Sequence, residues 1–481
     1  MERFDLLIVG GGINGAAIAR DAAGRGLSVL LVEKDDLAAH TSSASSKLIH
    51  GGLRYLENYD FRLVRESLHE REVMLRTAPH IIRPLRFILP DPPGGRPWWM
   101  IRLGLWTYDL LAGRSSLPRS RGVKASDAAA RAPLKPGFRL AAYYDAWVDD
   151  ARLVVLNALD AKERGAEIAT RTELLSAARD GDHWRAALGG GREVAANMLV
   201  NAAGPWVAEL LHDRLGIASR TAARLIKGSH IVVPRLWEGD HAYILQQPDG
   251  RFVFALPYGE SSLIGTTDVP VARPEDAAIS AEEIGYLCTA ANAYFARPIA
   301  PGDVTWSYAG IRSLYDDGAA SAKDVTRDYK LELDGTPGPK LLSVFGGKVT
   351  TARALATEAL DTLGVGGLKF TATSPLPGGQ ITSGFNAWLE ELAGWMPGPL
   401  LQRLACAYGT RLDRLLDGVE TMAQLGRDFG AGLHEAEVRY LIAHEYARTA
   451  EDVLWRRTKL GLRMTEKERK AFADWMGIAI Q

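Results

Sequence analysis

The amino-terminal stretch Phe4–Glu33 reads FDLLIVGGGINGAAIARDAAGRGLSVLLVE and decides the fold of this chain. An apolar run leads into a glycine cluster and a small-residue helical pattern, and a second apolar run ends at Glu33. Gly10, Gly12 and Gly15 have the G-x-G-x-x-G spacing, which allows a tight turn, close approach of backbone to a pyrophosphate, and close helix–strand packing. The stretch therefore predicts a βαβ unit that binds a dinucleotide, with Glu33 on the ribose. It does not distinguish FAD from NAD.

Composition sets the class of protein. A chain of 481 residues exceeds one ordinary core, so two or three domains are expected. The hydrophobic content of 47% and charged content of 24% are typical of a soluble globular protein, and a net charge of -1 gives no signal for nucleic acid. Cys288 and Cys406 have no metal or redox spacing, which suits a reducing compartment. An early first strand and the lack of long apolar runs predict a cytoplasmic chain without a signal peptide or membrane span.

Loop-forming residues and residues that break helices or strands divide the rest of the chain. The hydroxyl-rich segment Thr41–Glu57 is typical of a loop and helix cap, and repeated prolines from 79 to 93 predict breaks. Short β-branched and aromatic runs between 226 and 268 predict an antiparallel sheet, hence a second domain. A proline/glycine linker at 374–380 precedes a segment with only helical patterns. Helices are also expected at 61–75, 149–164, 281–295 and 350–363.

The segment Arg96–Lys124 combines aromatic and basic residues. It contains Trp98, Trp99, Trp106 and Tyr108 among six cations, with Asp109 as its one acidic residue. Aromatics interleaved with cations suit a surface that lies in the membrane interface. The alternative is a core helix whose arginines pair with acids elsewhere.

The chain closely resembles the FAD-dependent (aerobic) glycerol-3-phosphate dehydrogenases in a series of short segments that are spread over nearly its whole length. The resemblance lies in segments 10–16 (GGGINGA), 41–57 (TSSASSKLIHGGLRYLE), 147–153 (WVDDARL), 201–207 (NAAGPWV), 225–234 (LIKGSHIVVP), 264–268 (IGTTD), 310–312 (GIR), 326–329 (TRDY) and 341–351 (LLSVFGGKVTT). Ser313 stands where the family pattern leads us to expect proline. The absence of a calcium-loop pattern favours the bacterial form.

The resemblance implies an α/β fold of the glutathione-reductase and D-amino-acid-oxidase type, with FAD as the cofactor. A discontinuous FAD-binding domain is expected at 1–80, 147–222 and 306–373. A substrate-binding domain with an antiparallel sheet is expected at 81–146 and 223–305, and an all-helical domain at 381–481.

The reaction implied by the resemblance is oxidation of sn-glycerol 3-phosphate to dihydroxyacetone phosphate, with hydride transfer to flavin N5. Electrons then pass to a membrane quinone, from an enzyme held peripherally on the inner face of the cell membrane. A homodimer is possible, and no nucleic-acid partner is expected.

A dianionic phosphate needs convergent cations, preferably guanidinium groups. The candidates are Arg54, Arg312, Arg327 and Lys348, each in or beside a glycine-containing or polar loop. Tyr55 and Thr267 are candidates to hydrogen-bond the substrate.

The secondary alcohol needs a proton acceptor, for which histidine is the usual choice. His50 and His230 are the candidates, and the choice between them stays open. Arg312 or Arg54 are alternatives that would stabilise an alkoxide without a neutral base.

The flavin needs donors along its pyrophosphate, ribityl chain and ring. No cluster has metal-ligand spacing, so no metal is expected. The predicted cofactor-binding residues are Gly10, Gly12, Ile13, Asn14, Gly15, Glu33, Lys34, Thr41, Ser42, Ser45, Ser46, Lys47, Leu48, His50, Gly51, Ala203, Gly204, Trp206, Gly310, Gly347, Lys348, Val349 and Thr350.

Two other functions compete with this interpretation. One is a soluble glycerol-phosphate oxidase, which performs the same half-reaction but passes electrons to oxygen and makes hydrogen peroxide. The other is a flavin- or nucleotide-binding protein that has no catalytic use for its pocket and whose helical tail is an interaction module. The set of four cations argues against the second.

Overall fold

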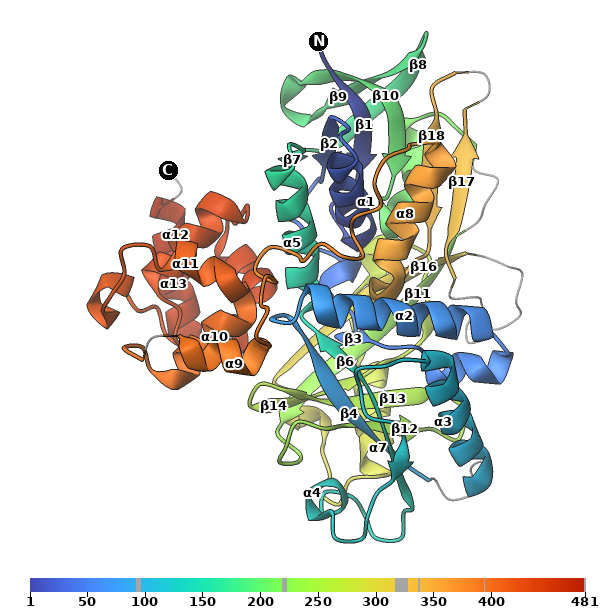
Figure 1. The fold of residues 1–481 in the computed structure, drawn as a ribbon, viewed down its shortest axis with the longest axis vertical. Coiled ribbons are helices and arrows are strands. Elements are labelled where there is room, and N and C mark those ends of the chain that lie inside the picture. Colours follow the sequence, from blue (N-terminus) through green and yellow to red (C-terminus); the bar gives the residue numbers. More distant parts are fainter. Residues whose placement is uncertain (92–96, 219–222, 316–327, 336–337, 393, 480–481) are drawn as a thin grey trace.

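The computed structural model describes residues 1–91, 97–218, 223–315, 328–335, 338–392 and 394–479, apart from the side chains of residues 54, 57 and 58. It forms two sheets and a separate group of helices at the carboxyl end (Figure 1).

The first sheet contains the phosphate-loop strand predicted from the sequence. Its strand order is β17-β18-β10-β1-β2-β7, with the β8–β9 hairpin paired to β10. Strands β18, β10, β1, β2 and β7 run parallel, so their carboxyl ends meet at one edge. The bounds are β1 Glu2–Val9, β2 Val29–Val32, β7 Glu167–Ala169, β8 Leu174–Asp180, β9 His183–Leu188, β10 Glu193–Asn201, β17 Lys330–Asp334 and β18 Leu341–Phe345.

Three helices pack with the first sheet around one apolar core. They are α1 (Ile13–Gly24), α5 (Asp150–Glu163) and α8 (Ala352–Leu363). The alanine-rich face of α1 lets all three approach closely, and strand side chains such as Leu6 and Ile8 are fully buried beneath them. Burying each such side chain contributes about 1.5–3 kcal/mol, which fixes the phosphate loop on a rigid base.

The second sheet is mostly antiparallel and lies at the other end of the two-sheet body (Figure 1). Its order is β15-β11-β14-β13-β12-β4-β6-β3, with β16 paired to β11 and β5 to β6. Helix α2 (Phe61–Thr77) lies across the junction, α3 (Trp98–Ala112) lies beside it, and α4 (Ala128–Arg131) and α7 (Ala281–Asn292) lie at the far end. The strands are β3 Leu48–Ile49, β4 Ile82–Pro90, β5 Arg121–Gly122, β6 Leu140–Val148, β11 Ala223–Pro234, β12 Ala242–Gln246, β13 Phe252–Tyr258, β14 Ser261–Gly265, β15 Val269–Pro270 and β16 Trp306–Tyr315.

The proline-rich stretch forms strand β4 instead of the predicted series of breaks. Pro84 pairs with Ala146 of β6, and the other neighbour, β12, pairs only with Phe87 and Ile88. One edge of β4 is therefore unpaired at Pro84, and Pro90 is the last residue of the strand. Proline is tolerated at such positions because no ladder N–H is required there.

The carboxyl-terminal segment forms helices, as predicted. They are α9 Phe385–Glu391, α10 Gly398–Tyr408, α11 Leu412–Leu415, α12 Glu435–His444, the π-helical turn Asp452–Arg457 and α13 Glu466–Ala479. Helices α10 to α13 and the π-helical turn share a core that includes Leu404, Val438 and Phe472, and this group of helices lies beside α5 (Figure 1). The architecture of two sheets and a helical domain is thus confirmed. The domain boundaries stay a prediction, and β16 belongs by its pairing to the second sheet.

Candidate active site

A large cavity, about 800 Å³, lies between the two sheets. Its lining includes the residues that follow the carboxyl ends of β1, β2, β10 and β18, together with residues of β11 and β16. In open parallel sheets this edge is where nucleotides bind, because helix N-termini and turn backbone face it.

The glycine loop is shaped for close backbone approach. Gly10 has a φ of +114°, and an added Cβ would lie 2.4 Å from the carbonyl oxygen of Ala202. Gly15 packs so tightly that a Cβ would meet the carbonyl oxygen of Gly10 at 1.9 Å. Gly12 begins α1 without a side-chain cap, and Ser42 Oγ accepts a hydrogen bond from Ile13 N at 2.9 Å instead. The start of α1 thus faces the cavity through backbone N–H groups.

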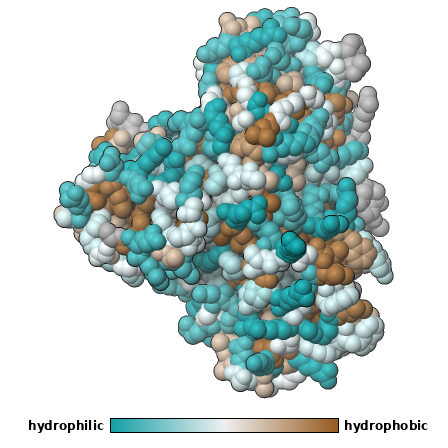
Figure 2. All heavy atoms as spheres, in the orientation of Figure 1, coloured by the Kyte–Doolittle hydropathy of each residue, from teal (hydrophilic) through white to brown (hydrophobic). Residues whose placement is uncertain are grey.

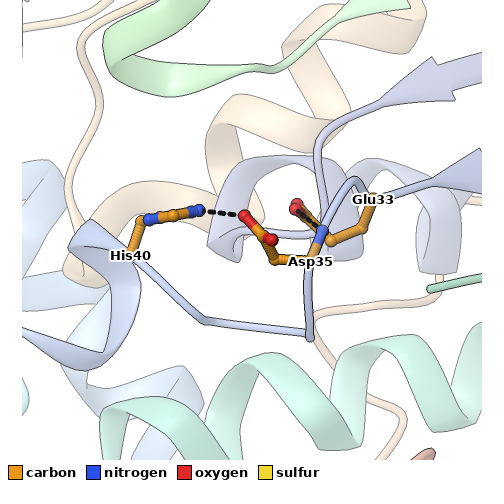
Figure 3. A group of neighbouring side chains, drawn as sticks. All are labelled: Glu33, Asp35 and His40. Carbon is orange, nitrogen blue, oxygen red and sulfur yellow. Dashed lines mark hydrogen bonds and ion pairs between the residues drawn. The ribbon is translucent and has the colours of Figure 1, made fainter. Parts of the chain in front are cut away.

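Glu33 follows β2, beside the glycine loop, at the end of the site where the ribose of a dinucleotide is expected. Its carboxylate accepts hydrogen bonds from Gly11 N at 2.6 Å and Asp35 N at 2.9 Å, and burial raises its pKa. Asp35 in turn pairs with His40 at 2.8 Å (Figure 3). Among the described residues, these three side chains form a group with spacing compatible with a metal ion. Because their carboxylates already have backbone and histidine partners, we assign the group to the dinucleotide site.

Most of the predicted site residues line this one cavity. The catalytic and substrate candidates His50, Tyr55, His230, Arg312 and Lys348 do so. The cofactor candidates that do so are Gly10, Ile13, Asn14, Glu33, Lys34, Thr41, Ser42, Ser45, Ser46, Leu48, Ala203, Gly204, Trp206, Gly310, Gly347, Val349 and Thr350. Segments more than 300 residues apart in the chain are therefore brought together.

Besides Gly12 and Gly15 of the glycine loop, three described residues of the predicted site lie behind the cavity wall. The Lys47 ammonium group pairs with Asp150 at 2.6 Å, and burial lowers its pKa to about 8. Gly51 donates its N–H to the Tyr108 hydroxyl group. Thr267 donates its hydroxyl group to Glu283 at 2.7 Å and is 1% exposed, so its neighbour Thr266 lines the cavity in its place.

Two predicted cations cannot be placed. Residue Arg327 and the side chain of Arg54 lie outside the described residues. Their roles stay predictions.

The two cations that are placed differ in their surroundings. Lys348, in the loop after β18, has a buried Nζ 4.0 Å from the ring centre of Tyr55, with no hydrogen-bond partner among the described residues. Arg312, on β16, pairs with Asp268 and donates to Thr266 Oγ1 at 3.0 Å. Both cations line the same cavity, so the site offers a bound anion an ammonium group and a preoriented guanidinium group.

His230 is held rigidly on β11. Its Nε2 lies 2.8 Å from Ser46 Oγ, and its ring stacks on Tyr308 at 4.8 Å. Burial, helped by the charges of Lys47 and Arg312, holds the pKa of His230 well below its usual range. The ring is therefore neutral at physiological pH.

Close-packing glycines make room for these side chains, a feature that the sequence prediction missed. A Cβ on Gly228 would lie 2.3 Å from Arg312 Nη2, and one on Gly265 would lie 2.1 Å from the His230 ring. Both glycines lie in quoted segments of the family pattern, LIKGSHIVVP and IGTTD. His40, whose ring lies 4.6 Å from that of Trp206 beside the ribose end, was also missed.

The described residues fit a bound dinucleotide. Gly10 gives backbone access, the N-cap residue Gly12 has no side chain to cap α1, and Asn14 Oδ1 is a buried acceptor without a hydrogen-bond partner among these residues. Together with the two imidazoles, with Arg312 on β16 and with Lys348 in the loop after β18, these features define a dinucleotide-dependent oxidoreductase.

Comparison with known proteins specifies the family. The FAD dependent oxidoreductase family model matches residues 5–353, and the model for the C-terminal domain of alpha-glycerophosphate oxidase matches 369–479. A glycerol-3-phosphate dehydrogenase of Pseudomonas aeruginosa is 51% identical, covering 99% of this chain and 95% of its own. A D-erythritol 1-phosphate dehydrogenase of Brucella abortus is 49% identical, covering 98% of each chain.

A solved structure extends the likeness to the whole fold. The glycerol-3-phosphate dehydrogenase from Bacillus halodurans, complexed with FAD, matches with a TM-score of 0.75 at 26% identity, over 99% of this chain and 91% of that one. The chain belongs to the family of FAD-dependent glycerol-3-phosphate dehydrogenases. Its cofactor is FAD.

Proposed function

We propose that this protein oxidises sn-glycerol 3-phosphate to dihydroxyacetone phosphate. The observation that carries the proposal is the pair of cations, Lys348 and Arg312, in the same cavity as two imidazoles. Lys348 Nζ is buried without a hydrogen-bond partner among the described residues, and a dianionic phosphate would supply one. The Pseudomonas relative is named for this substrate.

Bound in the cavity, FAD supplies the two-electron acceptor. The chain itself must orient the alcohol and take its hydroxyl proton. We assign the proton to His50, which lines the cavity, because the depressed pKa of His230 makes that ring a weak acceptor near neutrality. His230, fixed by Ser46 and Tyr308, would instead orient the substrate hydroxyl.

The histidine assignment is tested by rapid mixing of each variant with substrate under anaerobic conditions. His50→Gln should slow flavin bleaching at pH 7 far more than His230→Gln. The reverse order of effects would move the base to His230.

The length of the carbon chain needs its own test, because the Brucella relative is named for a four-carbon polyol phosphate. Values of kcat/KM for glycerol 3-phosphate and for D-erythritol 1-phosphate should be compared in one assay. We expect the three-carbon substrate to be preferred. A preference for D-erythritol 1-phosphate would be compatible with the same phosphate site but would make D-erythritol 1-phosphate the substrate instead of glycerol 3-phosphate.

Helix α3 supports a peripheral position on a membrane. Trp99, Leu103, Trp106 and Leu110 are each at least half exposed, and basic residues surround the helix in the sequence. Hydrophobic residues gather on this side of the molecule (Figure 2). Exposed aromatic and apolar residues with nearby cations are attracted to an anionic lipid interface. Among the described helices, none combines the length and apolar character needed to cross a bilayer.

A membrane position favours a quinone as the electron acceptor. Residues of α3, including Trp99 and Leu103, also line the active-site cavity, so the cavity reaches the proposed lipid-facing helix. We therefore propose that electrons pass to a quinone on the inner face of the cell membrane. The test is turnover in vesicles that contain ubiquinone, with peroxide measured in parallel. Quinone reduction without peroxide is expected, whereas stoichiometric peroxide would make the protein an oxidase.

A further inference from the structure

The cavity wall contains one long loop, residues 33–47, that joins the ribose end of the site to the second sheet. Eight of its residues line the cavity, from Glu33 to Ser46. Within residues 35–47 the helical content is one short turn, Thr41–Ser43. A loop of this length needs contacts from elsewhere to hold one conformation.

The helical domain provides such contacts at the ribose end. Arg457 is 1% exposed and places both Nη atoms on the Asp36 carboxylate, at 2.6 and 2.8 Å. Arg456 Nε reaches the same carboxylate at 2.6 Å. Asp36 is 2% exposed, so this two-arginine contact is shielded from water and salt.

A second contact lies at the other end of the loop. The buried Asp150 carboxylate accepts hydrogen bonds from Ser45 N, Ser45 Oγ and Lys47 Nζ. Lys459 of the helical domain lies 3.4 Å from Asp149 and 3.7 Å from Asp150. Burial would raise the pKa of Asp150, but Lys47 and Lys459 lower it, which keeps the carboxylate charged.

The helical domain is itself fixed on α5. The Arg152 guanidinium group forms a bidentate ion pair with Glu445, and both side chains are fully buried. Arg152 also donates to the carbonyl oxygen of Ala407. Asp149, Asp150 and Arg152 all lie in the segment WVDDARL, to which the proposed reaction gives no role.

We propose that Arg456, Arg457 and Lys459 form a clamp by which the helical domain orders loop 33–47 and so retains FAD. They are positioning residues, because each acts on the cavity through Asp36 or Asp150. WVDDARL is the docking motif for the domain that bears the clamp. The inference concerns cofactor retention and is independent of the proposed substrate and acceptor.

The test compares full-length variants by FAD affinity and by hydrogen exchange. Arg457→Gln removes the two-pronged guanidinium contact with Asp36, and Arg457→Lys keeps the positive charge. Lys459→Met removes the contact with Asp149 and Asp150. Arg439→Gln is the matched control, because it removes an arginine–glutamate pair from an exposed part of the same domain. Apo-proteins are titrated with FAD by fluorescence below their unfolding temperatures, and amide exchange is measured for residues 33–47.

We expect Arg457→Gln to raise the FAD Kd at least tenfold and to speed exchange in 33–47 by a similar factor. Arg457→Lys should recover part of both effects, and the control should change neither. If Arg457→Gln does not fold, Lys459→Met decides the question, with an expected Kd increase of at least threefold and faster exchange at 43–47. Wild-type Kd and wild-type exchange in the folded variant would overturn the proposal.

Discussion

Replacement of Arg312 by Met tests the proposed phosphate site most selectively. The guanidinium group is held by Asp268 and Thr266, and its side chain is 24% exposed. Hydrogen bonds to charged groups contribute about 1.5–3 kcal/mol, and partial exposure favours the lower value. A two-pronged contact with phosphate then contributes about 3 kcal/mol, which corresponds to a loss in kcat/KM of roughly 150-fold.

Arg312→Lys keeps the charge but only one of the two contacts, so its loss should be about tenfold. The assay is anaerobic flavin reduction with glycerol 3-phosphate and, separately, with unphosphorylated glycerol. Both variants should be indistinguishable from wild type with glycerol and should keep FAD. Arg251→Met is the control, because Arg251 pairs with Asp249 in the turn between β12 and β13. An equal loss with both substrates would refute a phosphate contact.

Three further predictions concern the cofactor, the fold and the membrane. Glu33→Gln should weaken FAD binding roughly tenfold, because a neutral amide replaces a carboxylate that accepts two backbone N–H groups; fluorescence titration measures it. Burial lowers the pKa of His80 to about 3, so unfolding takes up a proton below pH 6.5, and stability should fall by about 2 kcal/mol from pH 6.5 to pH 5. Urea unfolding should show this slope in wild type and a shallower one in His80→Gln; parallel slopes would exclude His80. The pair Trp99→Ser and Trp106→Ser should reduce sedimentation with anionic vesicles several-fold while glycerol 3-phosphate still bleaches the flavin; unchanged sedimentation would remove α3 from the membrane contact.

Local sequence signals predicted the secondary structure around the glycine loop. The glycine spacing, with an apolar run before it and a helical pattern after it, predicts a turn between a β-strand and a helix. The structure has Gly10 in that turn and Glu33 directly after β2. Strand β4 was missed because a proline lowers strand propensity everywhere, whereas its real cost depends on which edge is paired. That edge depends on β12, which lies more than 150 residues away.

The positions of Lys47 and Thr267 show the limit of reasoning from motifs. Both belong to segments that line the cavity, yet both side chains point to buried carboxylates, Asp150 and Glu283. Successive side chains of an extended segment point to opposite sides, so of two neighbouring residues only one faces the ligand. A shift of one residue along the chain exchanges their directions. The partners of Lys47 and Thr267 are set by tertiary packing, so the sequence alone could not assign them.

The central claim is that glycerol 3-phosphate reduces a flavin held in this cavity. The direct measurement is the absorbance spectrum of the purified protein under anaerobic conditions, before and after addition of sn-glycerol 3-phosphate. The account predicts flavin bands that bleach on addition, with dihydroxyacetone phosphate formed in equal amount to the flavin reduced. Flavin bands that persist at saturating substrate would contradict it.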